Sequence, residues 1–314
     1  MAQIGTDIEY AKQILDDSGV VAIPTETVYG LAGNALDTKA ILEIYKVKNR
    51  PKFDPLIAHI PSYQFAESMV THFPEPLRSL AGRFWPGPLT LLLDKQDHIP
   101  DLVTSGSSRV ALRVPSHPLT QKLLQKLDYP LAAPSANPFG YVSPTNPHHV
   151  NEQLGTLIPY ILDGASTEVG VESTIVGFEK GKVIVHRVGG LPIEQLEEVM
   201  GEVQLELNQS SNPVAPGMLK SHYSPGKKLT VGSIPELLKS LDPDHTGIIS
   251  FKEAFAGRYS HTLSPKGSLE EAASKLFHVL RELDSPEVLQ IISEPFPDEG
   301  LGKAINDRLR RASV

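Results

Sequence analysis

The 314-residue sequence contains no cysteine, and this absence excludes several kinds of site at once. A chain without cysteine cannot form a disulfide framework, a zinc–thiolate centre or a cysteine nucleophile. No apolar run approaches the roughly 20 residues that a membrane-spanning helix needs, and the first residues lack the basic stretch and apolar core of a signal peptide. We therefore expect a cytoplasmic protein.

The motifs of several common enzyme classes are missing as well. The sequence holds neither a G-x-x-x-x-G-K-[ST] phosphate loop nor a G-x-G-x-x-G motif after a strand. It also lacks the G-x-S-x-G elbow of serine hydrolases and an H-E-x-x-H metal site. Hydrolysis through a nucleophile of the protein itself is therefore poorly supported.

An excess of positive charge is absent too, because 29 Lys and Arg face 37 Asp and Glu, for a net charge of −8. Indiscriminate binding of polyanions is therefore not expected. Residues 1–211 hold 16 basic and 24 acidic side chains, whereas residues 212–314 hold 13 of each. This asymmetry, in a chain longer than the roughly 250–300 residues that one core usually serves, predicts two domains.

The first two-thirds of the chain predicts an α/β domain that mixes parallel and antiparallel strands. A capping box at Thr6 and Glu9 begins a helix that ends near Gly19, and a second helix is predicted over 38–48. A polar loop is expected at 25–30. Short apolar runs predict strands at 20–23, 56–60, 89–93, 110–114, 131–133, 160–162 and 173–178, the last forming a hairpin with 183–188.

The character of the sequence changes after a helix predicted at 193–200. Residues 207–228 are rich in Pro, Gly, Ser and Asn, which predicts a linker. Beyond it, alternating elements predict a small parallel sheet with right-handed crossovers. The expected elements are helix 234–241, strand 247–251, helix 268–283, strand 288–292 and helix 300–311. The predicted units are 1–206, 207–228 and 229–314.

Polar side chains follow several of the predicted strands. Thr25 and Thr27 come directly after the first strand, where α/β sheets bind ligands, although a capped turn explains them as well. Lys48 and Arg50 stand where the second helix ends. Cations there are favoured by the helix dipole, and two cations at this spacing can also hold one polyanion. Both explanations stay open.

Two charged or titratable residues interrupt otherwise apolar strands. His59 in LIAHI is typical of a satisfied core histidine. Arg113 in VALRV needs a partner, because arginine is seldom buried alone, and a ligand carboxylate would supply one. Further along, Ser135, Asn137 and Ser143 follow another strand as an array of donors, although turn formation explains them almost equally well.

Seven segments, taken in order, carry a resemblance: PTETVYGL, KVKNRPKFDPLIAHI, FWPGPLTLLL, VALRVPSHPL, LAAPSANPFGYVSPT, VESTIV and HRVG. Over residues 8–200 they closely resemble the YrdC family of threonylcarbamoyl-AMP synthases. The P-G-M-x-x-x-H-Y-x-P stretch at 216–225 resembles the long, two-domain (Sua-type) form. The resemblance implies a YrdC-like twisted mixed-sheet domain with a central cavity, plus a smaller Rossmann-like α/β C-terminal domain.

The resemblance also implies an activity. Family members condense L-threonine, bicarbonate or CO2, and ATP into L-threonylcarbamoyladenylate and release pyrophosphate. This is the first step of N6-threonylcarbamoyladenosine formation at tRNA position 37, and a separate tRNA threonylcarbamoyl transferase machinery uses the product. Magnesium would arrive with ATP. A membrane partner is not expected, and a transient contact with tRNA stays open.

Residue roles follow from the same resemblance. Lys48 and Arg50 should hold the triphosphate during catalysis. The other residues implied in ATP binding are Asp54, Ser135, Asn137, Ser143, Arg187 and Tyr223. Those implied in threonine binding are Thr25, Thr27, His59, Arg113 and Ser173. The segment 207–228, with His222 and Tyr223, should cover the cavity as a lid. Relatives often carry a small hydroxyl residue where Arg109 stands, so no role is assigned to it.

Two alternatives from other classes remain. The first is an RNA-binding module without catalysis, which the acidic first domain disfavours. The second is a carbamoyl-transfer enzyme of the hydrogenase-maturation kind. Such enzymes carry additional zinc-finger-like and acylphosphatase-like domains, for which a cysteine-free chain of 314 residues has no room.

Overall fold

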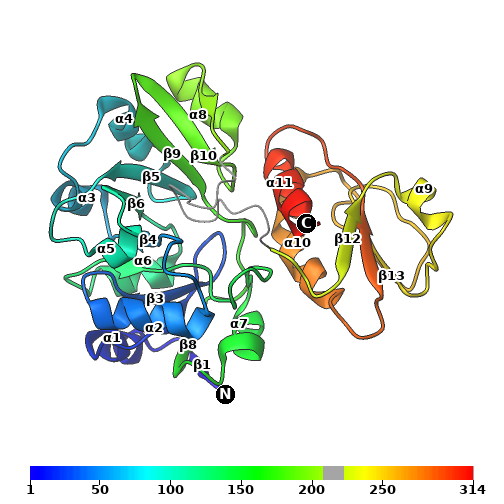
Figure 1. The fold of residues 1–314 in the computed structure, drawn as a ribbon, viewed down its shortest axis with the longest axis horizontal. Coiled ribbons are helices and arrows are strands. Elements are labelled where there is room, and N and C mark those ends of the chain that lie inside the picture. The colour runs from blue at the N-terminus through cyan, green and yellow to red at the C-terminus, as the bar shows by residue number, and fades with distance from the viewer. Residues whose placement is uncertain (208–222, 314) are drawn as a thin grey trace.

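The computed structural model describes residues 1–207 and 223–313. Figure 1 shows a larger α/β unit from the N-terminal part of the chain beside a smaller one from the C-terminal part. Helices α10 (Leu269–Glu282) and α11 (Gly302–Ala312) of the smaller unit face the larger one. The predicted linker and lid, 207–228, fall mostly outside the described residues, so their limits and covering role stay predictions.

The larger unit is built on a mixed sheet, as the sequence predicts. Strand β4 shows the mixture, since it pairs parallel with β6 and antiparallel with β7. Within the described residues the sheet has eleven strands, in the order β1 (Gln3–Gly5), β8 (Tyr160–Leu162), β2 (Val21–Ile23), β3 (Gly30–Asn34), β7 (Leu131–Ala132), β4 (Ile57–His59), β6 (Arg109–Arg113), β5 (Leu89–Asp94), β9 (Thr174–Glu179), β10 (Lys182–Arg187) and β11 (Gln204–Leu205).

Strand β3 lies where the sequence predicts the end of a polar loop and then nothing regular. Its glycines depress strand propensity, which is why the pattern GLAGN gives no strand signal. The fold needs them because neighbouring elements approach closely. A Cβ on Gly33 would lie 3.2 Å from Ile44 Cδ1 on α2, and one on Gly30 would lie 3.2 Å from Ala133 Cβ. Close packing therefore overrides propensity here.

Helices flank the sheet between its strands. They are α1 (Ile8–Asp16), α2 (Thr38–Lys48), α3 (Tyr63–Met69), α4 (Glu75–Phe84), α5 (Asp101–Thr104), α6 (Pro118–Leu124), α7 (Pro147–Leu154) and α8 (Ile193–Met200). The predicted capping box at Thr6 is wrong by one residue. Asp7 is the N-cap of α1, because its extended backbone lets the carboxylate accept from the Tyr10 amide at 3.0 Å.

Helix α2 spans the predicted residues, and its last turn matters for the site. The helix ends at Asn49, which adopts a left-handed conformation with φ of 51°. This is a common way to end a helix, and it stops α2 two residues before Pro51. The turn leaves Lys48 and Arg50 both buried, at 1% and 8% exposure. A solvated pair of helix-end cations would be exposed, so the dipole alone does not explain them.

The smaller unit contains a four-stranded, all-parallel sheet in the described residues, which confirms the prediction. The order is β12 (Lys228–Val231), β15 (Gln290–Ser293), β13 (Thr246–Ser250) and β14 (Tyr259–Thr262), with helix α9 (Ile234–Leu238) following β12. Ser268 caps α10 as predicted, accepting from the Glu271 amide at 3.1 Å.

One hydrophobic cluster joins the two units. Val142 and Val171 of the larger unit pack in the same buried cluster as Phe277 of α10 and Leu309 of α11. Apolar burial across the junction therefore holds α10 and α11 against the larger unit. Within the described ranges, no helix combines the length and the apolar character that crossing a membrane requires.

Candidate active site

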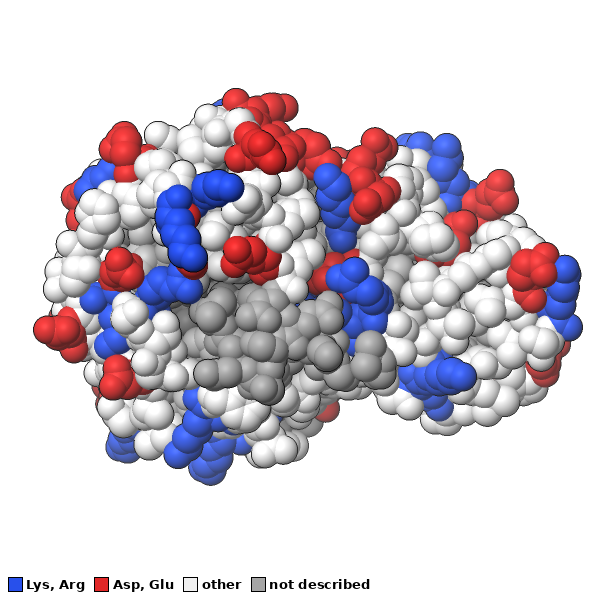
Figure 2. Space-filling model, turned by 45° about the horizontal axis from the view of Figure 1, so that its top comes forward, with Lys and Arg blue, Asp and Glu red and all other residues white. Residues whose placement is uncertain are grey.

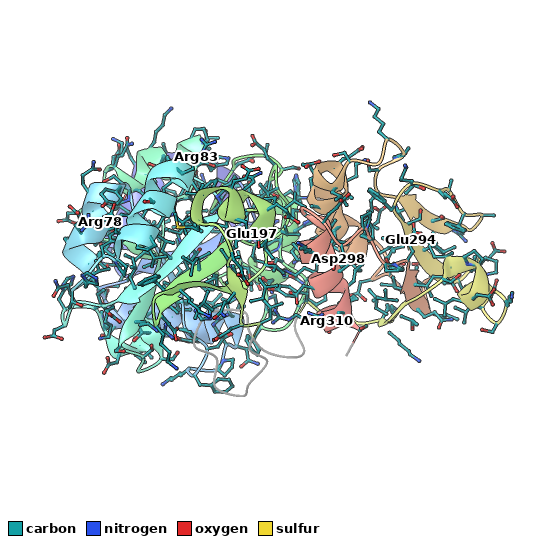
Figure 3. All side chains as sticks on the ribbon, turned by 90° about the horizontal axis from the view of Figure 1, so that it is seen from above. Arg78, Arg83, Glu197, Glu294, Asp298 and Arg310 are labelled. Atoms are coloured by element: carbon teal, nitrogen blue, oxygen red, sulfur yellow. The ribbon has the colours of Figure 1, made fainter. Side chains whose placement is uncertain are left out.

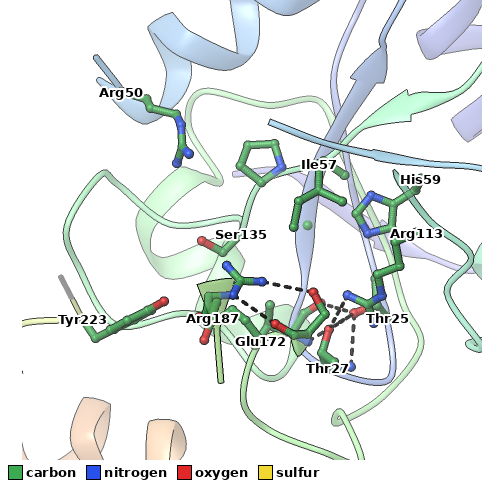
Figure 4. Close-up of a pocket in the computed structure, with 15 residues that line it drawn as sticks. Thr25, Thr27, Arg50, Ile57, His59, Arg113, Ser135, Glu172, Arg187 and Tyr223 are labelled. Atoms are coloured by element: carbon green, nitrogen blue, oxygen red, sulfur yellow. Dashed lines mark hydrogen bonds between the residues drawn. The ribbon is translucent and has the colours of Figure 1, made fainter. Parts of the chain in front are cut away.

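A cavity lies in the larger unit at the ends of several strands, beside the smaller unit (Figure 4). Nine of the thirteen residues that the family resemblance implies line it: Thr25, Thr27, Arg50, His59, Arg113, Ser135, Ser173, Arg187 and Tyr223. They come from segments separated by up to about two hundred positions in the chain, and the mixed sheet brings their strands side by side. Val28, Gly30, Ile57, Ala133, Pro134 and Glu172 complete the lining.

Among the residues that the structure describes, basic side chains outnumber acidic ones on the cavity wall. It contains three arginines, Arg50, Arg113 and Arg187, against one carboxylate, Glu172. Figure 4 shows Arg113 with His59 on one side of the cavity and Arg50 on the other. A partly dry space with cations at both ends favours a ligand that carries negative charge at two places.

Arg113 is held at the cavity by a ring of short contacts. Its Nη1 donates to the Thr27 hydroxyl at 2.9 Å, and its Nη2 lies 2.8 Å from a carboxylate oxygen of Glu26. Thr25 continues this series of contacts, because its hydroxyl lies 2.8 Å from that of Thr27. Sequence reasoning missed Glu26, although it stands between the two threonines that were singled out. Its carboxylate partly neutralises Arg113, while hydrogen bonds to Thr27 and to the Gly87 carbonyl fix the direction of the guanidinium.

His59 is adjacent to Arg113 in the sheet register of β4 and β6. Burial, reinforced by the positive charge of Arg113, lowers the pKa of His59 to about 3, so the ring is neutral at physiological pH. Its Nδ1 has no hydrogen-bond partner among the described residues. A buried polar atom at a cavity wall without a partner is typical of a position that a ligand completes.

The buried histidines predict how stability depends on pH. Burial also lowers the pKa of His149 to about 3. The unfolded chain binds protons at histidine below about pH 6.5, whereas folded His59 and His149 do not until about pH 3. The unfolded state therefore binds more protons in this window. We expect each histidine to lower the free energy of unfolding by about 1–2 kcal/mol between pH 6.5 and 5.

Urea unfolding at pH 6.5 and pH 5 measures this effect. H59Q should reduce the stability lost between pH 6.5 and pH 5 by the about 1–2 kcal/mol that one histidine contributes. H72Q, which changes an exposed histidine of the same unit, should leave the difference as in the unmodified protein. An unchanged difference in H59Q would contradict the assignment of a neutral buried ring.

Arg50 is anchored to the loop that follows it. Its Nη2 lies 2.8 Å from an Asp54 carboxylate oxygen, and the guanidinium also donates to the carbonyls of Asp54 at 3.1 Å and Pro55 at 2.8 Å. Asp54 is fully buried and does not line the cavity. Its role in this geometry is to orient Arg50, so a direct contact with nucleotide stays a prediction.

Lys48 lies behind the cavity wall and not on it. Its ammonium donates to the backbone carbonyls of Ser135 and Asn137, and burial lowers its pKa well below the ordinary value. Lys48 therefore fixes the loop whose Ser135 side chain lines the cavity. Asn137 is buried in this loop, with its Nδ2 donating to the carbonyls of Pro138 and Tyr141 at 2.8 and 2.9 Å.

Ser173 and Arg187 form a second polar group on the wall. Arg187 donates to the carbonyl and to the hydroxyl of Ser173, both at 3.0 Å, and burial lowers the pKa of Arg187 to about 10. The Ser173 hydroxyl lies 2.7 Å from that of Thr90, which the sequence did not single out. Arg109, by contrast, pairs with Glu179 and is absent from the cavity lining.

At the end of the cavity nearest the smaller unit, lining residues contact helices of that unit. Tyr223 lines it and stacks on Phe277 of α10, with ring centroids 5.6 Å apart. Glu172 lines it too, and it pairs at 2.7 Å with Arg308 of α11. Burial raises the pKa of Glu172, but the charges of Arg308 and Arg187 outweigh this and lower it below the ordinary value. His222 lies outside the described residues.

Comparison with known proteins identifies the family. The Sua5, YciO and YrdC family model, described as "Telomere recombination", matches residues 13–189, and the model described as "Threonylcarbamoyl-AMP synthase, C-terminal domain" matches residues 191–314. The chain is 38% identical to the threonylcarbamoyl-AMP synthase of Pyrococcus abyssi, over 98% of this chain and 94% of that protein. It is 39% identical to that of Bacillus subtilis, over 98% and 92%.

A solved structure agrees with this over the whole fold. The crystal structure of Pyrococcus abyssi Sua5 complexed with L-threonine superposes with a TM-score of 0.92 at 35% identity, and it covers all of this chain and 97% of that one. Both domains, in the same order and arrangement, are thus shared. The chain belongs to the threonylcarbamoyl-AMP synthase family, in its two-domain form.

Proposed function

We propose that this protein condenses L-threonine, bicarbonate or CO2, and ATP into L-threonylcarbamoyladenylate and pyrophosphate. The observation that supports this best is the cavity with arginines at both ends, in a chain of this family. A carboxylate at one end and a triphosphate at the other are the two anionic groups of the substrates. The amino acid and the nucleotide would then meet in the middle.

In this proposal the threonine carboxylate binds Arg113, and the threonine lies against Thr25, Thr27, His59 and Ser173. The relative that superposes on this chain was solved with L-threonine. Thr27 and the Gly87 carbonyl hold the guanidinium in one direction, and a guanidinium held in this way suits the binding of a carboxylate. The neutral ring of His59 offers its buried Nδ1 to the ligand without adding charge beside Arg113.

The ATP end is formed by Arg50, Arg187, Ser135 and Tyr223 on the cavity wall, with Asn137 and Ser143 behind them. The neutral threonine amine adds to CO2 and loses a proton to solvent, and one oxygen of the resulting carbamate attacks the α-phosphorus of ATP. The bond from that phosphorus to the bridging oxygen breaks, and pyrophosphate leaves with the electron pair. The nucleophile belongs to the substrate, so the protein supplies position, positive charge and exclusion of water.

Magnesium is part of the proposal as the ion that accompanies ATP. Among the described residues no group of three or more His, Asp or Glu could hold an ion alone. In the proposal the ion keeps most of its waters and binds through the substrate phosphates. Glu172 is the carboxylate on the wall nearest the proposed ATP end, but it is engaged by Ser143 and Arg308.

The product would pass to the tRNA threonylcarbamoyl transferase machinery, so we place the reaction in the cytoplasm, where tRNA is modified. The alternative of an RNA-binding module gains little support from the surface. On the face shown in Figure 2, basic and acidic side chains are interspersed over both units. Such mixing weakens the general attraction that a phosphate backbone needs.

A pyrophosphate-release assay separates the two functions. We expect release from ATP only when threonine and bicarbonate are both present, and no tight complex with tRNA at physiological salt. Salt-dependent tRNA binding, together with pyrophosphate release that does not require threonine, would contradict the proposal.

The proposed threonine end also predicts selectivity between amino acids. Serine lacks the methyl group that apolar wall residues such as Ile57 would contact. One missing methyl limits discrimination to about 10- to 200-fold in kcat/KM. Valine keeps the shape but cannot pair with the buried hydroxyls, so it should react more poorly still. Competition assays at saturating ATP measure this, and equal turnover of all three would show that the pocket is misassigned.

A further inference from the structure

Helix α11 of the smaller unit places two buried arginines, Arg308 and Arg311, over the ring of the cavity-lining Tyr223, and Arg308 reaches further into the larger unit. Arg308 has an exposure of 0%, and its three nitrogens each have a partner. Nε donates to Glu172 at 2.7 Å, Nη1 to Asp307 at 2.7 Å, and Nη2 to the Val188 carbonyl at 3.1 Å. Glu172 and Val188 belong to the larger unit, so Arg308 joins the two units at the cavity.

Glu172 also contacts Ser143, a residue that the family resemblance implies in ATP binding. One carboxylate oxygen accepts from Arg308, and the other accepts from the Ser143 hydroxyl at 2.5 Å. Glu172 and Ser143 are both buried, at 6% and 0% exposure. The three side chains therefore form a continuous path, Arg308–Glu172–Ser143, in which Glu172 lies on the cavity wall and Ser143 is buried behind it.

A second arginine of the smaller unit holds the same segment from its backbone side. Arg281 of α10 donates to the carbonyls of Val142 and Ser143 and lies over the Tyr141 ring, 5.1 Å from its centroid. The Tyr141 hydroxyl in turn donates to Asp284 at 2.5 Å. The backbone around Ser143 is thus fixed independently of Arg308, which leaves the hydroxyl direction as the property that Glu172 and Arg308 control.

The negative charge of Glu172 gives the contact with Arg308 a second effect. Glu172 lines a cavity that, under the proposed function, receives a triphosphate. A bare carboxylate there would repel the phosphates and lower affinity for ATP. Arg308 neutralises it from behind, on the side away from the cavity, without occupying the space that the ligand needs.

We propose that Arg308 is a positioning residue of the active site: through Glu172 it orients the Ser143 hydroxyl and cancels the carboxylate charge at the ATP end. The proposal deepens the proposed function and rests on it for the identity of the ligand. It gives the C-terminal domain an indirect part in nucleotide binding, exerted through Glu172.

The test compares full-length R308M, E172Q and the double variant E172Q/R308M with the unmodified protein. Steady-state pyrophosphate release gives KM for ATP, KM for threonine and kcat, and calorimetric titration with Mg–ATP gives the affinity directly. R310M is the matched control, because Arg310 lies on the same helix (Figure 3) and also pairs with Asp307. Its side chain, however, is 57% exposed.

We expect R308M to raise KM and Kd for ATP about tenfold or more, the loss that accompanies a broken charged hydrogen bond. KM for threonine should stay unchanged, and R310M should behave as the unmodified protein. E172Q/R308M should bind ATP better than R308M alone, because the uncompensated carboxylate is gone. A purely structural role would lower kcat through a smaller folded fraction and leave both KM values alone.

An ATP affinity in folded R308M equal to that of the unmodified protein would overturn the proposal, as would a double variant no better than R308M. If R308M does not fold, E172Q is compared in the native and S143A backgrounds. E172Q should then change KM for ATP only while Ser143 is present. Equal effects in both backgrounds would show that Glu172 does not act through Ser143, which would overturn the proposal. Failure of the unmodified protein to release pyrophosphate would refute the proposed function, while the titrations would still test Arg308.

Discussion

Replacing Arg50 by alanine is expected to reduce kcat/KM for ATP by about 10²- to 10³-fold, the range seen when a preorganised charged donor is removed from a dry active site. Arg50 lines the cavity, and Asp54 and Pro55 fix its guanidinium there. The triphosphate would lose a charge-assisted partner that water cannot replace once the site is closed. Pyrophosphate release and Mg–ATP titration measure the effect.

K46A is the matched control for this prediction. Lys46 is on the same helix end and pairs with Glu43, but it is solvent-exposed. If cations at this helix end served only the dipole, K46A and R50A would have similar small effects on stability and none on ATP. ATP binding in R50A equal to that of the unmodified protein would therefore restore the dipole explanation and reject the assignment.

K48A should also weaken ATP binding, but by a different route. Lys48 holds the carbonyls of Ser135 and Asn137, so its loss leaves two buried acceptors without a donor and loosens the loop. We expect both variants to lose thermal stability, since R50A leaves the buried carboxylate of Asp54 without its cation. Per degree of lost stability, R50A should raise KM for ATP far more than K48A, because only Arg50 lines the cavity.

The second large effect is expected at Arg113. R113K should lower kcat/KM for threonine about 10- to 100-fold, because an ammonium cannot reproduce the fork that binds a carboxylate bidentately. It would also have to satisfy Glu26, Thr27 and the Gly87 carbonyl with fewer donors. KM for ATP should change much less, since Arg50 and Arg187 stay in place.

R109K is the control for this substitution. Arg109 belongs to the same strand, β6, but pairs with Glu179 away from the cavity. R109K should keep the threonine kinetics of the unmodified protein. Equal losses for threonine and ATP in R113K would show that Arg113 supports the fold of the sheet and not the carboxylate site.

Much of the larger domain could be predicted from the sequence because its signals are local. Helix α2 and strand β8 have the predicted limits, since caps and short apolar runs act over a few residues. Strand β3 could not be predicted, because its glycines signal a loop and only packing against α2 reveals the strand. The polar residues after strands were also visible, since strand ends mark where α/β sheets bind ligands.

The partners of the site residues could not be predicted. Glu172 is 136 positions from Arg308, and a carboxylate before a strand gives no sign of which cation neutralises it. Arg308 itself stands in INDRLRRA, where three arginines near a helix C-terminus are typical of a solvated end. Only the packing of α11 on the larger domain makes one of them fully buried.

The central claim, that threonine, CO2 and ATP meet in this cavity, is tested most directly by mass spectrometry of the product formed with ¹³C-bicarbonate. After incubation with ATP, Mg²⁺ and threonine, we expect an adenylate that carries threonine and one heavy carbon, and its formation should require all three substrates. A threonyl adenylate without the heavy carbon, or AMP alone in a reaction that proceeds equally without bicarbonate, would contradict the account.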